Sequence, residues 1–156
     1  FHNIIDEQDP VKAADVRRLV LCSGKVYYDL LEQRRADKVK EVALVRLEQL
    51  YPFPADEYQS IIGRYANARE VVWCQEEPQN QGAWYQIRHR LHAILGSGQQ
   101  LLYAGRDSAA APATGVHALH VKEQEALVKA ALYSSVTEES QRETQRLTAK
   151  STRKRT

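Results

Sequence analysis

The polar residues best suited to chemistry gather in one segment, Val71–Trp84, with the sequence VVWCQEEPQNQGAW. Its first residues suit a buried strand, and two carboxylates and four side-chain amides follow within a few positions. Neighbouring side chains of a strand point to opposite faces, so Glu76 and Glu77 would not converge as a general acid and base. Contact of one carboxylate with a substrate or cofactor is the alternative. We expect a contact surface for another domain, formed by Glu76, Glu77, Asn80, Gln81 and Trp84, and no catalytic residue.

A second candidate site lies at Cys22-Ser23-Gly24-Lys25, between an apolar run and a helical pattern. A glycine permits close approach to the backbone, a helix start offers free N–H groups, and Lys25 adds a cation, which together suit a phosphate or another anion. One glycine is not the G-x-G-x-x-G fingerprint. The alternative is that Gly24 forms a tight turn and Ser23 caps the helix. A bound ligand would be held by Ser23, Gly24, Lys25 and Arg46.

Two histidine pairs, His89-x-x-His92 and His117-x-x-His120, have the spacing of metal ligands. A zinc site needs three or four converging donors, and no carboxylate or cysteine adjoins either pair. We therefore expect solvent-facing histidines and no metal site. No nucleophile motif of the Gly-x-Ser-x-Gly type is present.

Composition is that of one globular domain: 156 residues, 43% hydrophobic and 27% charged. No apolar run approaches the ~20 residues of a membrane span. The chain starts at Phe1 and contains no Met, which we interpret as a cut point in a longer protein, and no signal peptide is recognisable. Cys22 and Cys74 lack CxxC spacing, and we expect both to be reduced, buried thiols.

The positive charge is concentrated at the end of the chain. Residues 1–134 hold 16 Lys and Arg against 17 Asp and Glu, whereas residues 135–156 hold 6 against 3. The last segment has almost nothing apolar to bury, so we expect residues 1–134 to form the domain and 135–156 a disordered, solvated basic tail.

Apolar periodicity predicts alternating strands and helices. Short β-branched runs indicate strands, and stripes at helical spacing between and after them, one of which opens with Trp84, indicate four helices. Trp73 and Trp84 are expected to anchor the core. This alternation predicts an α/β fold with an open, mostly parallel, twisted sheet and helices on both faces. The expected strands are Val16–Cys22, Glu41–Leu47, Arg69–Cys74 and Gln100–Ala104.

Three segments, Cys22–Arg35, Val42–Pro54 and Val71–Trp84, together resemble the carboxy-terminal domain of the decarboxylating component of the 2-oxoglutarate dehydrogenase complex. The resemblance runs from about Phe1 to Leu132. It implies a transketolase carboxy-terminal-like domain, the third of its subunit, with a structural and dimer-forming role. The alternative within the same family is a regulatory module for a nucleotide or acetyl-coenzyme A, because some actinobacterial relatives carry an acetyl-coenzyme A regulatory site in this region.

The resemblance also implies a parent enzyme, an oxidoreductase of the citric acid cycle that uses thiamine diphosphate and Mg²⁺. It would decarboxylate 2-oxoglutarate and pass the succinyl group to the lipoyl arm of the dihydrolipoyl succinyltransferase, in the bacterial cytoplasm or the mitochondrial matrix. Expected partners are the amino-terminal and middle domains, a second subunit and that transferase, but neither nucleic acid nor membrane. The family's Gly-Asp-Gly cofactor motif is missing here. We therefore expect the isolated chain to hold no cofactor and to be inactive; a free-standing enzyme using Glu76 or Glu77 is the remaining alternative.

Overall fold

The computed structural model describes residues 1–110 and 117–133. The predicted basic tail lies outside these residues, as do residues 111–116. Within the described residues, no helix combines the length and apolar character that a membrane span requires.

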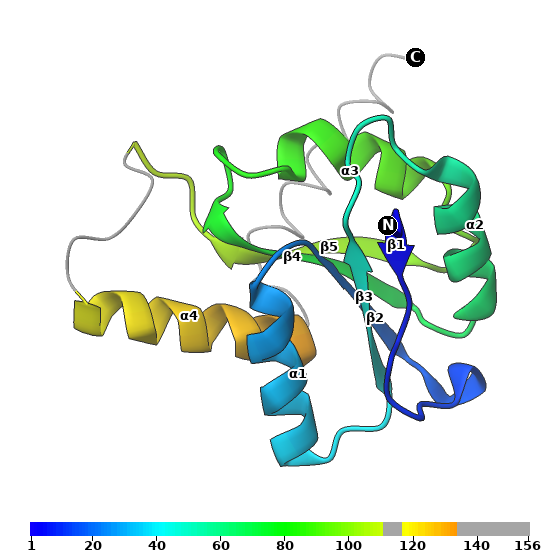
Figure 1. Ribbon diagram of the computed structural model, residues 1–156, viewed down its shortest axis with the longest axis horizontal. Coiled ribbons are helices and arrows are strands. Elements are labelled where there is room, and N and C mark those ends of the chain that lie inside the picture. Colours follow the sequence, from blue (N-terminus) through cyan, green and yellow to red (C-terminus); the bar gives the residue numbers. More distant parts are fainter. Residues whose placement is uncertain (111–116, 134–156) are drawn as a thin grey trace, which may run out of the picture.

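One open, mostly parallel sheet organises the chain (Figure 1), with strand order β1-β3-β2-β4-β5. The first strand is antiparallel to β3, and the other four run parallel to one another. The strands are β1 (Ile4–Ile5), β2 (Arg18–Cys22), β3 (Val42–Leu47), β4 (Glu70–Pro78) and β5 (Gln100–Arg106).

Helices cover both faces of this sheet (Figure 1), so the predicted fold class is confirmed. The helices α1 (Val26–Asp37) and α4 (His117–Leu132) pack on one face, and α2 (Ala55–Arg64) and α3 (Trp84–Ala93) on the other. A short 3-10 helix, η1 (Ala13–Asp15), precedes β2.

Two hydrophobic cores follow from the alternation of side chains along the strands. On β2, Leu19 and Leu21 face α2 and α3, whereas Val20 and Cys22 face α1 and α4. All five residues of β2 are buried, and the four that follow Arg18 form the continuous apolar run expected of a strand covered on both faces.

An ion-pair cluster fixes the amino-terminal segment after β1 ends. The Glu7 carboxylate accepts a 2.7 Å hydrogen bond from the backbone N–H of Leu44, and so continues the edge pairing of β3 beyond β1. The buried Arg34 guanidinium pairs with both Glu7 and Asp9. Hydrogen bonds, first from Arg35 and then from Arg34, lower the pKa of Asp9 from 3.8 to about 2, against the effect of partial burial.

The boundary of β4 differs from the prediction. The strand was expected to end at Cys74, but it continues to Pro78, with an irregularity in its pairing to β5 between Cys74 and Pro78. Consequently Gln75, Glu76 and Glu77 lie on a strand, and only the residues after Pro78 form the polar loop.

Candidate functional site

The carboxyl edge of the parallel strands holds both sets of candidate residues. Ligands and partners of open α/β sheets are usually met at this edge. At this edge, the polar side chain of Gln75 is buried. Its Oε1 accepts hydrogen bonds from the Trp73 indole (2.8 Å) and from the backbone N–H of Trp84 (3.2 Å). Its Nε2 donates to the carbonyls of Glu77 (3.1 Å) and Pro78 (3.0 Å).

The four hydrogen bonds of Gln75 tie the end of β4 to the start of α3. Gly82 packs directly on this amide, because a Cβ at that position would lie 2.5 Å from Gln75 Nε2. Gln75 therefore pairs with backbone groups of its own loop, and the small size of Gly82 lets the turn close on that amide. The loop is held from beneath by a fully bonded side chain.

Asn80 and Gln81 fasten the same loop to the segment after β5. The Asn80 side chain both donates to the carbonyl of Ala109 and accepts from its N–H, each at 3.0 Å. Gln81 Nε2 donates to the same carbonyl at 2.8 Å. Both residues are exposed, so their remaining polar capacity faces outward.

Glu76 and Glu77 diverge, as expected for neighbours on a strand. Glu76 is half-buried under α4, where its Oε1 accepts a 2.8 Å hydrogen bond from Gln124 and lies 3.8 Å from Lys25 Nζ. Glu77 is exposed. The two carboxylates therefore do not form an acid and base pair.

The structure brings the predicted ligand-binding residues together at the start of α1. Arg46 lies beside Cys22 in the sheet register, next to the turn that carries Ser23 and Gly24. Gly24 has a φ of 77°, and a Cβ there would meet nothing within 4 Å, so the turn is open to solvent. Ser23 does not cap the helix: the N-cap position is held by Lys25, and no described side chain caps it.

The cations of this second set already have partners within the chain. The Arg46 guanidinium lies 4.8 Å from the ring centre of Tyr27 and 5.6 Å from that of Tyr28, and its Nη2 lies 2.9 Å from Glu48 Oε1. Lys25, in turn, neighbours Glu76. These contacts reduce the positive charge available to an anion.

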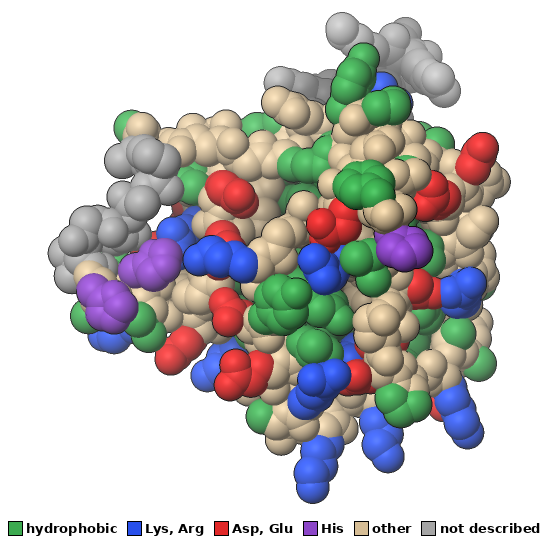
Figure 2. Space-filling model, viewed as in Figure 1, with side chains coloured by type: hydrophobic (Ala, Val, Ile, Leu, Met, Phe, Trp, Pro, Cys, Tyr) green, Lys and Arg blue, Asp and Glu red, His purple; other side chains and the backbone are tan. Residues whose placement is uncertain are grey.

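Exposed aromatic side chains accumulate at the same edge. Tyr28 and Tyr85 lie in the first turns of α1 and α3, and Tyr51 lies in the connection that leaves β3. Tyr51 is 87% exposed, and Phe1, which precedes the antiparallel β1, is 99% exposed. Figure 2 shows hydrophobic side chains over the start of α1 and over the connection between β3 and α2, among charged ones. We call these four residues the aromatic edge.

Trp84 lies beneath this surface. It is 8% exposed and packs against Tyr103, with ring centres 5.3 Å apart, so its predicted role as a core anchor is confirmed. Little of its surface is left for another domain. Burial raises the pKa of the Tyr103 hydroxyl, which donates a 2.9 Å hydrogen bond to the carbonyl of Arg106.

The histidines behave as predicted with one exception. His89, His92 and His117 are exposed. His120 is half-buried and its Nδ1 lies 2.9 Å from Arg106 Nη2, so the expectation of a solvent-facing side chain is wrong for this residue. Among the described residues, no group of three or more His, Cys, Asp or Glu side chains is arranged to hold a metal ion.

The two cysteines are free and buried, as expected. Cys22 and Cys74 are register neighbours on β2 and β4. Burial raises the pKa of the Cys22 thiol to about 12 and that of Cys74 well above its usual value. Neither thiol is therefore a nucleophile at neutral pH.

Comparison with known proteins shows the family of this chain. A family described as "2-oxoglutarate dehydrogenase C-terminal" matches residues 1–132. The chain belongs to this family. It is 51% identical over 132 residues to the "2-oxoglutarate dehydrogenase E1 component" of Haemophilus influenzae, covering 85% of this chain and 14% of that protein.

Two further relatives of this chain are also named "2-oxoglutarate dehydrogenase E1 component". The protein from Coxiella burnetii is 54% identical over 130 residues, covering 82% of this chain and 14% of its own length. The protein from Azotobacter vinelandii is 48% identical over 132 residues, covering 83% and 14%. The chain thus spans about 14% of the length of the curated relatives it matches. The resemblance predicted from the three sequence segments is confirmed.

Proposed function

We propose that this chain is the structural, dimer-forming carboxy-terminal domain of a 2-oxoglutarate dehydrogenase E1 component. The observation that carries the proposal is the aromatic edge, which adjoins a rigid polar loop at the carboxyl edge of the sheet. Aromatic side chains are enriched in the buried centres of protein interfaces, and polar groups at their rims. This edge has both, so it fits the surface that meets the amino-terminal and middle domains or a second subunit.

The polar loop suits docking because it is already ordered. Gln75 holds it from inside, and Asn80 and Gln81 hold it through Ala109. An ordered surface loses little conformational entropy on association, which favours binding. The exposed Glu77, Asn80 and Gln81 supply hydrogen-bonding groups at the rim, and Trp84 supports them from below. Glu76 is half-buried under α4, and its carboxylate already contacts Lys25 and Gln124, so it supports this surface from inside the chain.

The parent enzyme's chemistry belongs, in this proposal, to the rest of its subunit. Thiamine diphosphate supplies a carbanion-stabilising centre when it is bound, and Mg²⁺ holds its diphosphate. The donors at the carboxyl edge do not fit that metal: among the described residues no three His, Cys, Asp or Glu side chains gather at one point, and Asp29 and Glu76 are both occupied by the side-chain amide of Gln124. We therefore assign no catalytic residue and no cofactor to this chain. The parent would decarboxylate 2-oxoglutarate in the bacterial cytoplasm and hand the succinyl group to its transferase partner.

The docking role is tested in the intact parent enzyme with the double substitution Tyr51→Asp and Tyr85→Asp. Placing two carboxylates in an apolar contact should shift the enzyme toward monomers in analytical ultracentrifugation, since buried unpaired charges are costly. The matched control, Ala14→Asp and Ala66→Asp, adds the same charge to exposed positions at the opposite edge of the sheet. A Tyr51 and Tyr85 variant with unchanged dimerisation and thermal stability would contradict the proposal.

The second candidate function, a regulatory module for an anionic ligand such as a nucleotide or acetyl-coenzyme A, is favoured by one observation. The turn at Gly24 is open, and Arg46 and Lys25 flank it. Their charges are shared with Glu48 and Glu76, which makes this candidate the weaker one. Titration of the chain with adenine nucleotides and acetyl-coenzyme A, compared with Arg46→Ala, separates the two functions.

A further inference from the structure

A pocket lies beside the segments that lead into β2 and β3, at the amino ends of the parallel strands and away from the docking surface. It has a volume of about 570 Å³ and is enclosed by the segment around η1, the end of α1 and the connection from α1 to β3. Figure 2 shows Lys and Arg side chains gathered over the end of α1 and over this connection. We call this cavity the amino-edge pocket. Its lining includes three lysines and three apolar residues: Lys12, Lys38, Lys40, Pro10, Val11 and Val39.

Two arginines in the wall of the amino-edge pocket are already neutralised by carboxylates. The side chain of Arg34 is 2% exposed and pairs with Glu7 and Asp9. Arg35 donates two hydrogen bonds to Asp9, at 2.9 and 2.6 Å. These four groups balance in charge, so the two arginines shape the wall and leave the binding of a ligand to other side chains.

The three lysines supply the remaining positive charge. Lys12, Lys38 and Lys40 are exposed and have no ion-pair partner within residues 1–110 and 117–133. Asp15 is the further carboxylate of the lining. With the paired groups included, five cations face three carboxylates, which leaves a surplus of two positive charges. Ammonium groups are compact charges with three donors each, and several of them together suit an anion with several oxygens.

The backbone of Lys38 indicates independently that a side chain is wanted at this position. Lys38 ends α1 in the left-handed region, with φ of 54° and ψ of 38°, and its N–H reaches the carbonyls of Arg34 and Arg35. Glycine is the usual residue there, because a Cβ is disfavoured in this conformation. Among the described residues, Lys38 is the only non-glycine residue with a positive φ. Arg34 and Arg35 already complement the dipole of α1, so the dipole does not require a third cation.

We propose that the amino-edge pocket binds a phosphate ester of a small organic molecule. The three ammonium groups would hold the phosphate, whose charge of about −2 at neutral pH matches the surplus of two positive charges. Pro10, Val11 and Val39 offer apolar surface to the organic part, and pockets of this size commonly hold such molecules. A carboxylate fits less well, because the arginine forks that pair best with carboxylates are already filled.

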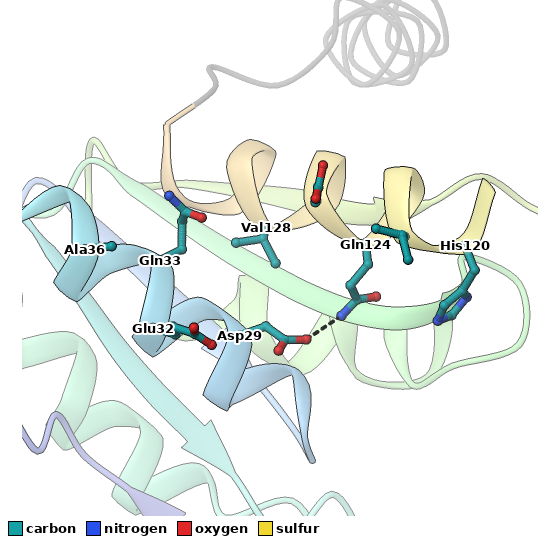
Figure 3. Close-up of a pocket in the computed structure, with 9 residues that line it drawn as sticks. Asp29, Glu32, Gln33, Ala36, His120, Gln124 and Val128 are labelled. Atoms are coloured by element: carbon teal, nitrogen blue, oxygen red, sulfur yellow. Dashed lines mark hydrogen bonds between the residues drawn. The ribbon is translucent and has the colours of Figure 1, made fainter. Parts of the chain in front are cut away.

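A groove between α1 and α4 offers a comparison within the same chain (Figure 3). Its lining is acidic and includes Asp29, Glu32 and Glu125, and Asp29 accepts a 2.8 Å hydrogen bond from Gln124. Carboxylates repel an anion, so the amide of Gln124 reports effects that are not due to binding in the amino-edge pocket. The amide of Gly24 serves in the same way for the open turn at the carboxyl edge.

The experiment titrates the 156-residue chain with phenyl phosphate at constant ionic strength and follows backbone amide shifts by NMR. The amides of Lys12, Lys38 and Lys40 should shift saturably, whereas those of Gln124 and Gly24 should not. Inorganic phosphate should bind about fivefold more weakly, since it lacks the ring and forgoes burial of ~40 Å² of apolar surface. Shifts at Gly24 without shifts in the pocket would overturn the proposal. Equal affinity for inorganic phosphate would identify a site for a free anion only, and would equally overturn it.

The substitution Lys38→Gly separates binding from folding. Glycine relieves the left-handed conformation, so the variant should melt at a higher temperature, yet its affinity for phenyl phosphate should fall about tenfold with the loss of one charge-assisted hydrogen bond. Lys12→Gln with Lys40→Gln should weaken binding further. The matched control, Lys122→Gln with Lys129→Gln, makes the same charge change at exposed positions of α4 and should leave the affinity unchanged. Unaltered affinity in Lys38→Gly, whichever way its stability moves, overturns the proposal, as does an equal loss in the control.

Discussion

Replacing Gln75 by Leu tests whether a buried amide organises the carboxyl edge. The substitution removes the acceptor of two buried donors, the Trp73 indole N–H and the Trp84 backbone N–H. The carbonyl of Pro78 keeps hydrogen bonds from the N–H groups of Gln81 and Gly82, so it does not add to the loss. Each buried donor left unsatisfied costs about 1–3 kcal/mol. The two together predict a loss of about 2–5 kcal/mol after the small apolar gain of Leu.

Urea unfolding followed by circular dichroism measures this loss. With a slope of about 2 kcal/mol per molar urea, the midpoint should fall by about 1–2.5 M. The matched control is Gln79→Leu at a half-buried amide that makes no side-chain hydrogen bond within the described residues, and its effect should stay within about 0.5 kcal/mol. A Gln75→Leu loss below about 1 kcal/mol would refute the reasoning, because the two donors would then be satisfied without the amide.

The remaining predictions concern packing, acid stability and cofactor binding. Gly82→Ala should destabilise the chain by about 1–3 kcal/mol in urea melts, because its Cβ would overlap a buried amide. Gly63→Ala in α2 meets nothing within 4 Å and should stabilise by about 0.5–1 kcal/mol. Trp84→Ala should cost about 3–5 kcal/mol, and a value under about 1 would contradict its burial. The lowered pKa of Asp9 contributes stability above pH 3.8 that is lost as pH falls through about 2. The destabilisation of Asp9→Asn in urea melts should therefore shrink across that interval, and a pH-independent difference would argue against the ion pair. Calorimetric titration with thiamine diphosphate and Mg²⁺ should show no binding to the isolated chain; a micromolar signal would be the contrary result.

Periodicity was enough to predict the four parallel strands of the sheet. The central strands β2 and β3 are buried almost throughout and therefore read as short apolar runs, and each helix carries an apolar stripe. The two-residue β1 is too short to carry a period. Its pairing with β3, and the position of Glu7 beyond it, depend on long-range contacts that a local pattern does not record.

The candidate site was predicted in part. The polar residues after Trp73 and the turn at Gly24 were singled out from residue type and from their position after an apolar run, and both lie at the carboxyl edge because parallel strands followed by helices all end there. The continuation of β4 was missed, since Gln75 is polar and its burial depends on partners from Trp84 and Pro78. The one signal available was Gly82, whose small size accommodates that amide.

Two other predictions were wrong for the same reason, namely that local sequence does not show contacts formed by packing. Ser23 has the residue type of a helix cap, but α1 begins two residues later than a cap at Ser23 requires. His120 lies on a polar face of α4, and its contact with Arg106 arises only when α4 packs across the end of β5. Side-chain partners that come from distant segments are set by packing, which a single sequence does not display.

The most direct measurement of the docking role is hydroxyl-radical footprinting of tyrosines in the intact parent enzyme and in the isolated chain. Tyr28, Tyr51 and Tyr85 are exposed in the isolated chain, as is Tyr133 at the far end of α4. If the aromatic edge meets the rest of the enzyme, the first three should react markedly more slowly in the intact enzyme, while Tyr133 keeps its rate. Equal rates for Tyr28, Tyr51 and Tyr85 in both samples would show that the carboxyl edge is a free surface and would contradict the docking role.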